Sequence, residues 1–209
     1  MKVLVEDEAK ALLKRYGIPT TKYEVVRSRE NLGRLRLDYP LVMKVRSPNI
    51  LHKTEVGGIV LDIKNQEDLL KAYELMRARF PEEVLVVESM EKGIELIIGL
   101  IDDPTFGLAI MFGLGGVFTE VLRDVSFRVV PITRWDAKQM LEELKAKQIL
   151  EGFRGIKVNK EALIALLLKT SKLGEDLDLE QLDMNPVFAR EDGVCVADAK
   201  IIFKSDRDC

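Results

Sequence analysis

A loop in the first third of the chain gathers side chains that can handle a phosphoryl group. Residues 44–59 read KVRSPNILHKTEVGGI and hold the single histidine of the sequence, His52. Lys44 precedes this histidine, Lys53 follows it directly, and Gly57 and Gly58 end the loop. A neutral imidazole can accept and release phosphate, and residues without a Cβ atom let backbone N–H groups approach an anion. The alternative is a solvent-exposed histidine with no chemical role, which the spacing alone does not exclude.

The C-terminal residues predict a β-hairpin with a second group of polar side chains. Two alternating segments, LDMNPVFA and VCVADAKIIF, flank Glu191-Asp192-Gly193, and an Asp-Gly pair is typical of a two-residue hairpin loop. With Asp192-Gly193 as the loop, residue 191 pairs with residue 194 and Asp198 lies opposite Val187. Asn185 and Asp198 are then diagonal neighbours, with roughly 7–8 Å between their backbones.

Alternation along this hairpin places oxygen ligands on one face and apolar side chains on the other. An amide and a carboxylate within reach of each other could hold one Mg²⁺ that keeps several of its waters. The alternative is that Asp183 and Asp198 cap turns or solvate the sheet. The polar face is predicted to hold Asp183, Asn185, Asp198 and Lys200, and the apolar face Leu182, Met184, Phe188, Cys195, Ala197, Ala199 and Ile201.

The residues before position 91 predict alternating helices and strands, which is the pattern of an α/β layer. The strand over residues 41–45 delivers Lys44, and the strand over 84–87 leads into the polar segment ESMEKG. That segment is the expected boundary between subdomains of residues 1–90 and 91–209. The predicted elements are a helix over 7–16, a short helix from Ser28, a helix after the cap Asn65, and strands over 22–26, 41–45, 59–63 and 84–87.

The second subdomain is expected to be a sheet covered by helices. Strands are predicted over residues 94–101, 107–112 and 125–130, helices over 135–144 and 159–173, and the hairpin completes the sheet. Between two of these strands lies GLGG, residues 113–116, which is either a tight turn or a loop whose N–H groups bind phosphate. The chain is therefore assigned to the α/β (α+β) class.

Composition narrows the class of protein. Charged residues make up 32% of the 209 residues, yet the formal net charge is only −3, which argues against a nucleic-acid partner. The longest uncharged run is shorter than the ~20 apolar residues of a membrane span, and no signal peptide is recognisable, so we expect a cytoplasmic protein. Cys195 and Cys209 are too few for a disulfide framework or a zinc site. The high charged fraction is also typical of thermophiles.

Several motifs together resemble a known family. YGIP after the first helix, PLVMKV with SPNILHKTEVGGI, ESM before IELIIG, FGLGGVFTEVLRDVSFR, and LDMNP paired with VADAKI are similar to the β subunit of archaeal ADP-forming acetyl-CoA synthetase. That is an ATP-grasp protein related to the β subunit of succinyl-CoA synthetase. The resemblance implies an ATP-grasp fold with a nucleotide between two antiparallel sheets. It also implies a CoA-binding α subunit, in an α₂β₂ assembly that converts acyl-CoA, ADP and phosphate into acid, CoA and ATP.

Seven positions match residues with which this family binds ATP. Lys44 resembles the strand lysine that contacts the phosphates, and Glu95 resembles the acid near the ribose. The others are the loop glycines Gly57 and Gly58, whose N–H groups would add to charge neutralisation, and the hinge residues Glu88, Ser89 and Met90, whose backbone reads adenine.

Four further positions match the phosphoryl-transfer machinery of the family. Asn185 and Asp198 match its two Mg²⁺ ligands, and Asp183 matches an acid that steadies a phosphohistidine. His52 resembles the second histidine of a relay, which takes phosphate from a histidine of the α subunit and gives it to ADP. Two alternatives stay open: a stand-alone ATP-grasp carboxylate ligase, which would not need His52, and a nucleotide-binding regulatory module without turnover.

Overall fold

The computed structural model of the chain describes residues 2–50, 53–81, 83–116, 124–152 and 157–204. The chain divides into an N-terminal unit, residues 5–8 and 21–91, and a C-terminal unit, residues 1–4, 9–20 and 92–209. This division differs from subdomains of 1–90 and 91–209 in residues 1–4 and 9–20, which belong to the C-terminal unit, and in residue 91, which belongs to the N-terminal unit. None of the helices in the described ranges is long and apolar enough to span a membrane.

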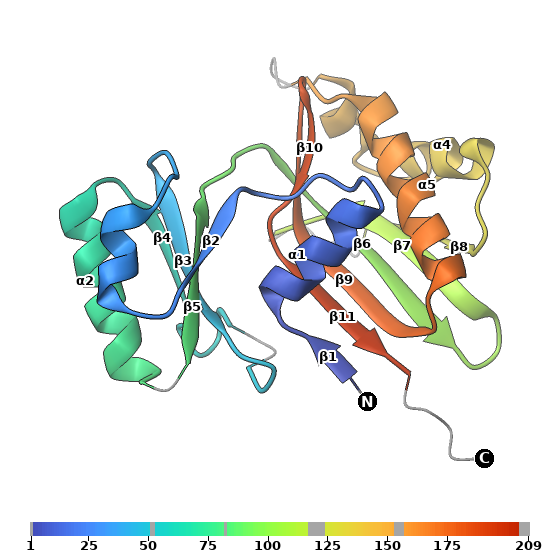
Figure 1. Cartoon of the computed structure of the whole chain (residues 1–209). Coiled ribbons are helices and arrows are strands. Elements are labelled where there is room, and N and C mark those ends of the chain that lie inside the picture. The colour runs from blue at the N-terminus through green and yellow to red at the C-terminus, as the bar shows by residue number, and fades with distance from the viewer. Residues whose placement is uncertain (1, 51–52, 82, 117–123, 153–156, 205–209) are drawn as a thin grey trace, which may run out of the picture. The chain divides into compact units, whose positions relative to one another are not determined.

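The N-terminal unit is a four-stranded antiparallel sheet with helices packed on one face (Figure 1). The spatial order of its strands is β2 (Tyr23–Val26), β5 (Val84–Ser89), β3 (Leu41–Arg46) and β4 (Ile59–Ile63). Apolar side chains of β3 and β5 form its core with those of helix α2 (Gln66–Arg79) and the 3₁₀ helix η1 (Arg29–Arg34).

Helix α2 begins at the side-chain cap that the sequence predicts. Asn65 Oδ1 accepts a hydrogen bond from the N–H of Asp68 at 2.9 Å, and Asp68 Oδ2 accepts one from Asn65 Nδ2 at 3.0 Å. The cap satisfies an N–H group that the first turn of a helix leaves without a partner. The predicted helix start is therefore confirmed.

The C-terminal unit is built on a seven-stranded antiparallel sheet (Figure 1). Helices α1 (Glu6–Arg15, from residue 9 onward), α4 (Arg134–Glu142) and α5 (Lys160–Asp176) share one core with this sheet. The 3₁₀ helix η2 (Lys147–Glu151) adds Leu150 to that core. The strand order is β1 (Lys2–Leu4), β11 (Ala199–Phe203), β9 (Leu179–Arg190), β6 (Ile94–Asp103), β7 (Gly107–Leu114) and β8 (Val125–Val129), and β10 (Gly193–Val196) pairs with β9.

The C-terminal hairpin has a different register from the predicted one. Arg190 pairs with Gly193, so the loop is Glu191-Asp192 and the predicted pairing of 191 with 194 is wrong by two residues. Gly193 is the first residue of β10 and has φ 149°, a conformation open mainly to glycine. The glycine therefore starts the second strand instead of ending the turn. As a result Asn185 lies directly opposite Asp198, whose carbonyl accepts a hydrogen bond from the N–H of Asn185 at 3.2 Å.

The alternation of buried and more exposed side chains along β9 changes phase at residues 185–186. The register between β9 and β6 shifts between Leu96 and Ile98, so two residues of β9 face one residue of β6, as in a β-bulge. The predicted apolar face is correct for Leu182, Met184, Ala199 and Ile201. Phe188, Cys195 and Ala197 lie outside this apolar cluster, although Cys195 and Ala197 are buried, and Val187, Ala189, Val194 and Val196 belong to it.

Candidate functional site

Five polar side chains of the N-terminal unit form a hydrogen-bonded network centred on Lys44, which we call the charge chain. Thr21 Oγ1 donates to Glu88 Oε2 at 2.7 Å, and Glu88 Oε1 pairs with Lys44 Nζ at 2.7 Å. Lys44 Nζ also donates to Glu6 Oε1 at 2.9 Å, and Glu6 Oε2 accepts a bond from Lys53 Nζ at 2.5 Å. Two ammonium groups and two carboxylates therefore neutralise one another within one network.

Burial makes the charge chain costly to disrupt. The side chains of Lys44, Glu6 and Glu88 are 5%, 1% and 2% exposed, and that of Lys53 is 14% exposed. A buried charge is tolerated only where its partners offset the hydration it has lost, and removing one partner leaves the other uncompensated. The charge chain therefore ties together β3, the end of β5 and the first turn of α1.

Lys44 lies between two carboxylate partners, Glu6 and Glu88. Its predicted contact is with nucleotide phosphates, so a phosphate at this point would join Glu6 and Glu88 around the same ammonium group. Glu88, predicted as a hinge residue, directs its side chain into the charge chain. Glu6 is missed by sequence reasoning. Its only signal is a place in the acidic first turn of α1, which the helix dipole would explain equally well.

The hinge residues Ser89 and Met90 use their backbone N–H groups inside the N-terminal unit. The N–H of Ser89 donates to the carbonyl of Lys22 at 3.0 Å, and the N–H of Met90 donates to the carbonyl of Pro40 at 2.9 Å. These bonds hold the end of β5 in place. A nucleotide base at the hinge would therefore meet the remaining backbone groups.

Close packing at Gly58 and a positive φ of 66° at Gly57 explain why these two positions of the loop have no Cβ atom. A Cβ atom on Gly58 would lie 2.6 Å from Val45 Cγ1, and one on Gly57 would lie 1.8 Å from a neighbouring guanidinium nitrogen. The N–H of Gly58 donates to the carbonyl of Lys53 at 2.6 Å, which closes the turn. Packing thus accounts for Gly58 and backbone conformation for Gly57, and their contact with phosphate stays a prediction. His52 lies outside the described residues.

A second ion pair holds the same strand to the same helical turn. Arg46, two residues after Lys44 on β3, pairs with Asp7 through Nε and Oδ1 at 2.5 Å and through Nη2 and Oδ2 at 3.3 Å. The hydrogen bond to Asp7 raises the pKa of Arg46. Tyr23 Oη donates to the backbone carbonyl of Asp7 at 3.0 Å, and burial, followed by the charges of Asp7 and Glu6, raises the pKa of Tyr23.

The C-terminal unit carries Asp183, Asn185 and Asp198 outside its apolar core. Asn185 is exposed, and the two aspartates are half-buried. Asn185 and Asp198 occupy directly opposite positions. Asp183, two residues before Asn185 on β9, lies opposite Lys200 of β11 in the strand register. Opposed residues of an antiparallel pair have Cβ atoms about 4.5–5.5 Å apart. The predicted diagonal arrangement is therefore wrong, and the amide and the carboxylate lie nearer to each other than it implied.

The chemistry of this pair suits Mg²⁺. The amide oxygen of Asn185 and the carboxylate of Asp198 are hard oxygen donors, which Mg²⁺ prefers. Within the described ranges there is no group of three or more His, Cys, Asp or Glu side chains that could hold a metal ion by themselves. Two protein oxygens fit an ion that takes its other ligands from water and from phosphate, as Mg²⁺ does.

Glu95 lies beside the end of the GLGG segment. It is exposed on β6, and its backbone carbonyl accepts a hydrogen bond from the N–H of Gly115 at 2.7 Å. A Cβ atom on Gly116, which has φ 64°, would lie 2.8 Å from Glu95 Oε2. Gly113 and Leu114 belong to β7, and Gly115 and Gly116 follow the strand directly. The acid predicted near the ribose is therefore packed against Gly115 and Gly116.

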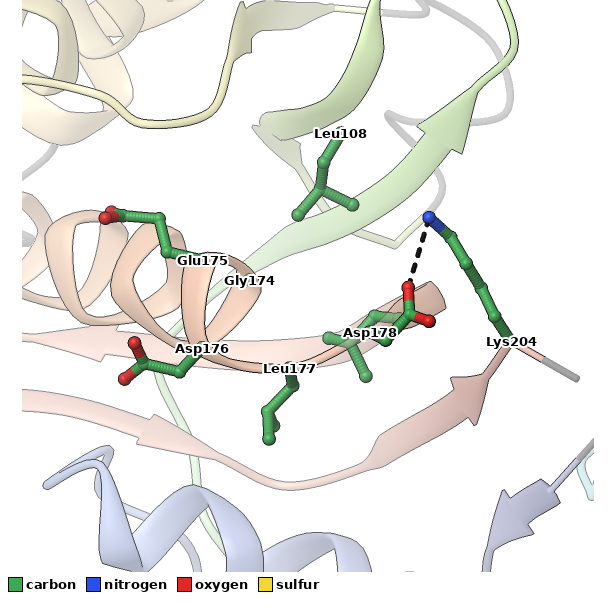
Figure 2. A pocket seen from close by; sticks show the side chains of 8 residues that line it. Leu108, Gly174, Glu175, Asp176, Leu177, Asp178 and Lys204 are labelled. Carbon is green, nitrogen blue, oxygen red and sulfur yellow. Dashed lines mark ion pairs between the residues drawn. The ribbon is translucent and has the colours of Figure 1, made fainter. Parts of the chain in front are cut away.

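A separate hollow of about 310 Å³ lies at the C-terminal end of α5 (Figure 2). At its edge Lys204 pairs with Asp102 at 3.0 Å and with Asp178 at 3.3 Å. The hydrogen bond to Asp102 raises the pKa of Lys204. The described lining of this hollow includes none of the predicted site residues, and its cation is paired, so it is not part of the candidate site.

The chain is similar to known proteins over nearly its whole length. A family model described as an ATP-grasp domain matches residues 1–203. The β subunit of acetate–CoA ligase (ADP-forming) I from Pyrococcus furiosus is 44% identical over 211 residues, which cover 95% of this chain and 91% of the relative. Acetate–CoA ligase (ADP-forming) II from Archaeoglobus fulgidus is 42% identical over 96% of this chain, which corresponds to 30% of that longer protein.

A solved structure is also similar over nearly the whole length. It is the dinucleotide-forming acetyl-coenzyme A synthetase 1 of Ca. Korarchaeum cryptofilum in complex with coenzyme A and Mg-AMPPCP, with its phosphohistidine segment pointing towards the nucleotide-binding site. The TM-score is 0.85 and the identity 41%, with 97% of this chain and 93% of that chain covered. The chain thus belongs to the ATP-grasp family and, within it, to the β subunits of ADP-forming acetate–CoA ligases.

Proposed function

We propose that this chain is the nucleotide-binding β subunit of an ADP-forming acyl-CoA synthetase, which converts acyl-CoA, ADP and phosphate into a carboxylic acid, CoA and ATP. The observation that carries the proposal is the direct pairing of Asn185 with Asp198 outside the apolar core. Support also comes from the P. furiosus relative, a β subunit of such a ligase, and from the related synthetase with coenzyme A and Mg-AMPPCP.

The step assigned to this chain is phosphoryl transfer from His52 to ADP. The phosphorus–nitrogen bond of the phosphohistidine breaks while phosphorus bonds to a terminal oxygen of ADP, and the imidazole leaves as a neutral ring because its other nitrogen keeps its proton. Such a transfer needs in-line placement of donor and acceptor and positive charge around the phosphoryl oxygens. Asp183 lies on β9, two residues before the proposed metal ligand Asn185. It would steady the phosphohistidine by accepting a hydrogen bond from the N–H of the ring.

Two groups of residues would supply the positive charge that this step needs. Lys44 would bind the nucleotide phosphates from its place between Glu6 and Glu88. Asn185 and Asp198 would hold Mg²⁺, and the bound ion would neutralise negative charge on the nucleotide and the phosphoryl group. The hinge of Ser89 and Met90 would bind the base.

The reaction needs a second protein part that handles CoA. In the A. fulgidus relative the matched region is 30% of one longer chain, whereas the P. furiosus relative is a separate subunit. We infer a CoA-binding α subunit that carries the first phosphohistidine, in an α₂β₂ assembly in the cytoplasm, where CoA and ADP are available. Light scattering of the co-purified complex tests this stoichiometry, and a particle that holds only one copy of each chain rejects it.

The activity is tested with the tagged chain co-purified with its partner. The complex should make ATP only when acyl-CoA, ADP and phosphate are all present, and the chain without its partner should make none. His52→Ala should abolish ATP formation in the complex and leave nucleotide binding unchanged. A chain that consumes ATP alone to join a carboxylate to an amine would instead be a stand-alone ligase.

The metal ligands are tested by Asp198→Ala. Loss of a group that supports a metal ligand lowers metal affinity about 10–100-fold. The affinity of Asp198→Ala for Mg-ADP should fall by at least this factor, because the variant loses a ligand itself. Glu180→Gln is the matched control, because Glu180 is an exposed acid on the same strand as Asn185. Calorimetric titration with and without Mg²⁺ measures both, and an unchanged affinity in Asp198→Ala would remove the basis of the proposal.

A further inference from the structure

Glu6 places one carboxylate between two lysines that frame the proposed phosphoryl loop. Its Oε1 binds Lys44 Nζ at 2.9 Å, its Oε2 binds Lys53 Nζ at 2.5 Å, and the side chain is almost fully buried. Lys44 lies on β3 before the loop, and Lys53 directly follows His52 in the sequence. One buried acid therefore connects the strand before the loop with the residue after the histidine.

The backbone closes the same connection on its other side. The carbonyl of Lys53 accepts a hydrogen bond from the N–H of Gly58 at 2.6 Å, and the carbonyl of Gly58 accepts one from the N–H of Val45 at 2.9 Å. Lys53 is thus held at its side chain by Glu6 and at its carbonyl by Gly58. Loss of Glu6 removes the side-chain bond and leaves the backbone bond.

We propose that Glu6 is a positioning residue for phosphoryl transfer. Its carboxylate sets Lys44 for the nucleotide phosphates and Lys53 for the phosphoryl group carried by His52, and it acts through these lysines without touching the substrate. The role rests on the proposed function of the chain. Cations stabilise the transition state best when they are in place before the reaction, and a lysine held by a buried acid has already lost its rotamer freedom.

Glu6 also sets the net charge that the nucleotide meets. The charged groups of the charge chain sum to zero, so Glu6→Gln leaves an excess of one positive charge while the shape of the side chain is kept. The extra positive charge should still attract an anionic nucleotide, so nucleotide binding should be kept. The amide has one oxygen in place of two, however, so only one of the two lysines can keep its hydrogen bond to residue 6, and transfer should slow. Binding and transfer should therefore respond differently, whereas a purely structural loss would reduce both.

The test measures labelling of the co-purified complex by ATP labelled at its γ-phosphate, with Mg²⁺, without CoA and at saturating ATP. Wild type should be labelled and His52→Ala should not; an unlabelled wild type would reject the proposed function itself. If wild type is labelled, Glu6→Gln should be labelled at least about tenfold more slowly, because small displacements of the groups around the reacting phosphoryl lower the rate by such factors. Its nucleotide Kd should stay within about threefold of wild type. Labelling at the wild-type rate overturns the role of Glu6.

Two further variants separate positioning from general loosening. Asp7→Asn also removes one carboxylate from the first turn of α1 and one ion pair with β3, the pair with Arg46. It should be labelled at the wild-type rate, and equal slowing in Asp7→Asn and Glu6→Gln overturns a specific role. Glu6→Asp keeps the charge on a side chain too short to meet both lysines, and should be slow as well. If Glu6→Gln does not fold, folded Glu6→Asp decides, and its labelling at the wild-type rate rejects the proposal.

Discussion

Replacement of Lys44 by methionine tests how strongly the charge chain stabilises the fold. Methionine has a similar length and no charge, so Lys44→Met removes a cationic partner from both Glu6 and Glu88, whose side chains are 1% and 2% exposed. Breaking a buried ion pair from one side costs about 3–5 kcal/mol, because the remaining charge keeps its desolvation penalty. Two acids lose a partner here, so we expect about 4 kcal/mol of the free energy of unfolding to be lost.

Urea unfolding followed by circular dichroism measures this loss. With a slope of about 2 kcal/mol per molar urea, the midpoint should fall by about 2 M. Lys71→Met is the control, because Lys71 and Glu67 form an ion pair that is largely exposed and screened by water, and its midpoint should not move. Adding Glu88→Gln to Lys44→Met restores the balance of charge, so the midpoint should recover in part. A Lys44→Met midpoint within about 0.3 M of wild type would refute the buried network.

Three other measurements follow from packing and charge. Gly58→Ala should destabilise the chain by about 1–3 kcal/mol, since its Cβ would lie 2.6 Å from a valine methyl. Gly33→Ala is the control and should not destabilise the chain, because a Cβ atom at this position has no neighbour within 4 Å. Equal thermal midpoints of the two variants would contradict the close packing at Gly58. Asp124→Ala should cost about 2 kcal/mol or more in urea unfolding, because the buried Asp124 carboxylate accepts two backbone N–H groups at 2.8 Å. The hydrogen bond from Arg128 lowers the pKa of Glu143, so this acid stabilises the fold above its unfolded pKa and loses that effect as pH falls through the folded one. Glu143→Gln should therefore flatten the fall in thermal midpoint below about pH 4, and an unchanged pH profile would exclude the ion pair.

Helices and strands could be predicted because their signals are local. The start of α2 is set by Asn65 and Asp68, three residues apart, so both partners of the cap are visible in the sequence. The strands before and after the hinge are apolar runs bounded by turn residues. In such segments, short-range preference and the final fold agree, and the sequence alone is sufficient.

The hairpin shows where local signals stop. Asp192-Gly193 is compatible with several loops, and the positive φ of Gly193, which decides the register, is not encoded in its neighbours. The reversal of faces at 185–186 depends on how β9 meets β6, a strand far away in the sequence. Asn185 and Asp198 could therefore be chosen as a pair from their chemistry, but not placed directly opposite each other.

The charge chain lay beyond prediction for a similar reason. Thr21, Lys44, Lys53, Glu6 and Glu88 come from separate segments, and each has the type of side chain that usually lies on a surface. Only tertiary packing reveals that they are buried together. No periodicity separates a buried lysine with two partners from an exposed one.

Strand β3 is covered by hydrocarbon on one side and by ions on the other. Leu41, Met43 and Val45 belong to the apolar cluster, whereas Lys44 and Arg46 meet acids of the first helical turn. A register shift of this strand by one residue would exchange its apolar and its cationic side chains. The cations would then enter the apolar core, and the methyl groups would face the carboxylates. A misaligned sheet would therefore lose stability on both of its faces, so the ion pairs of Lys44 and Arg46 also favour the correct alignment of the strand.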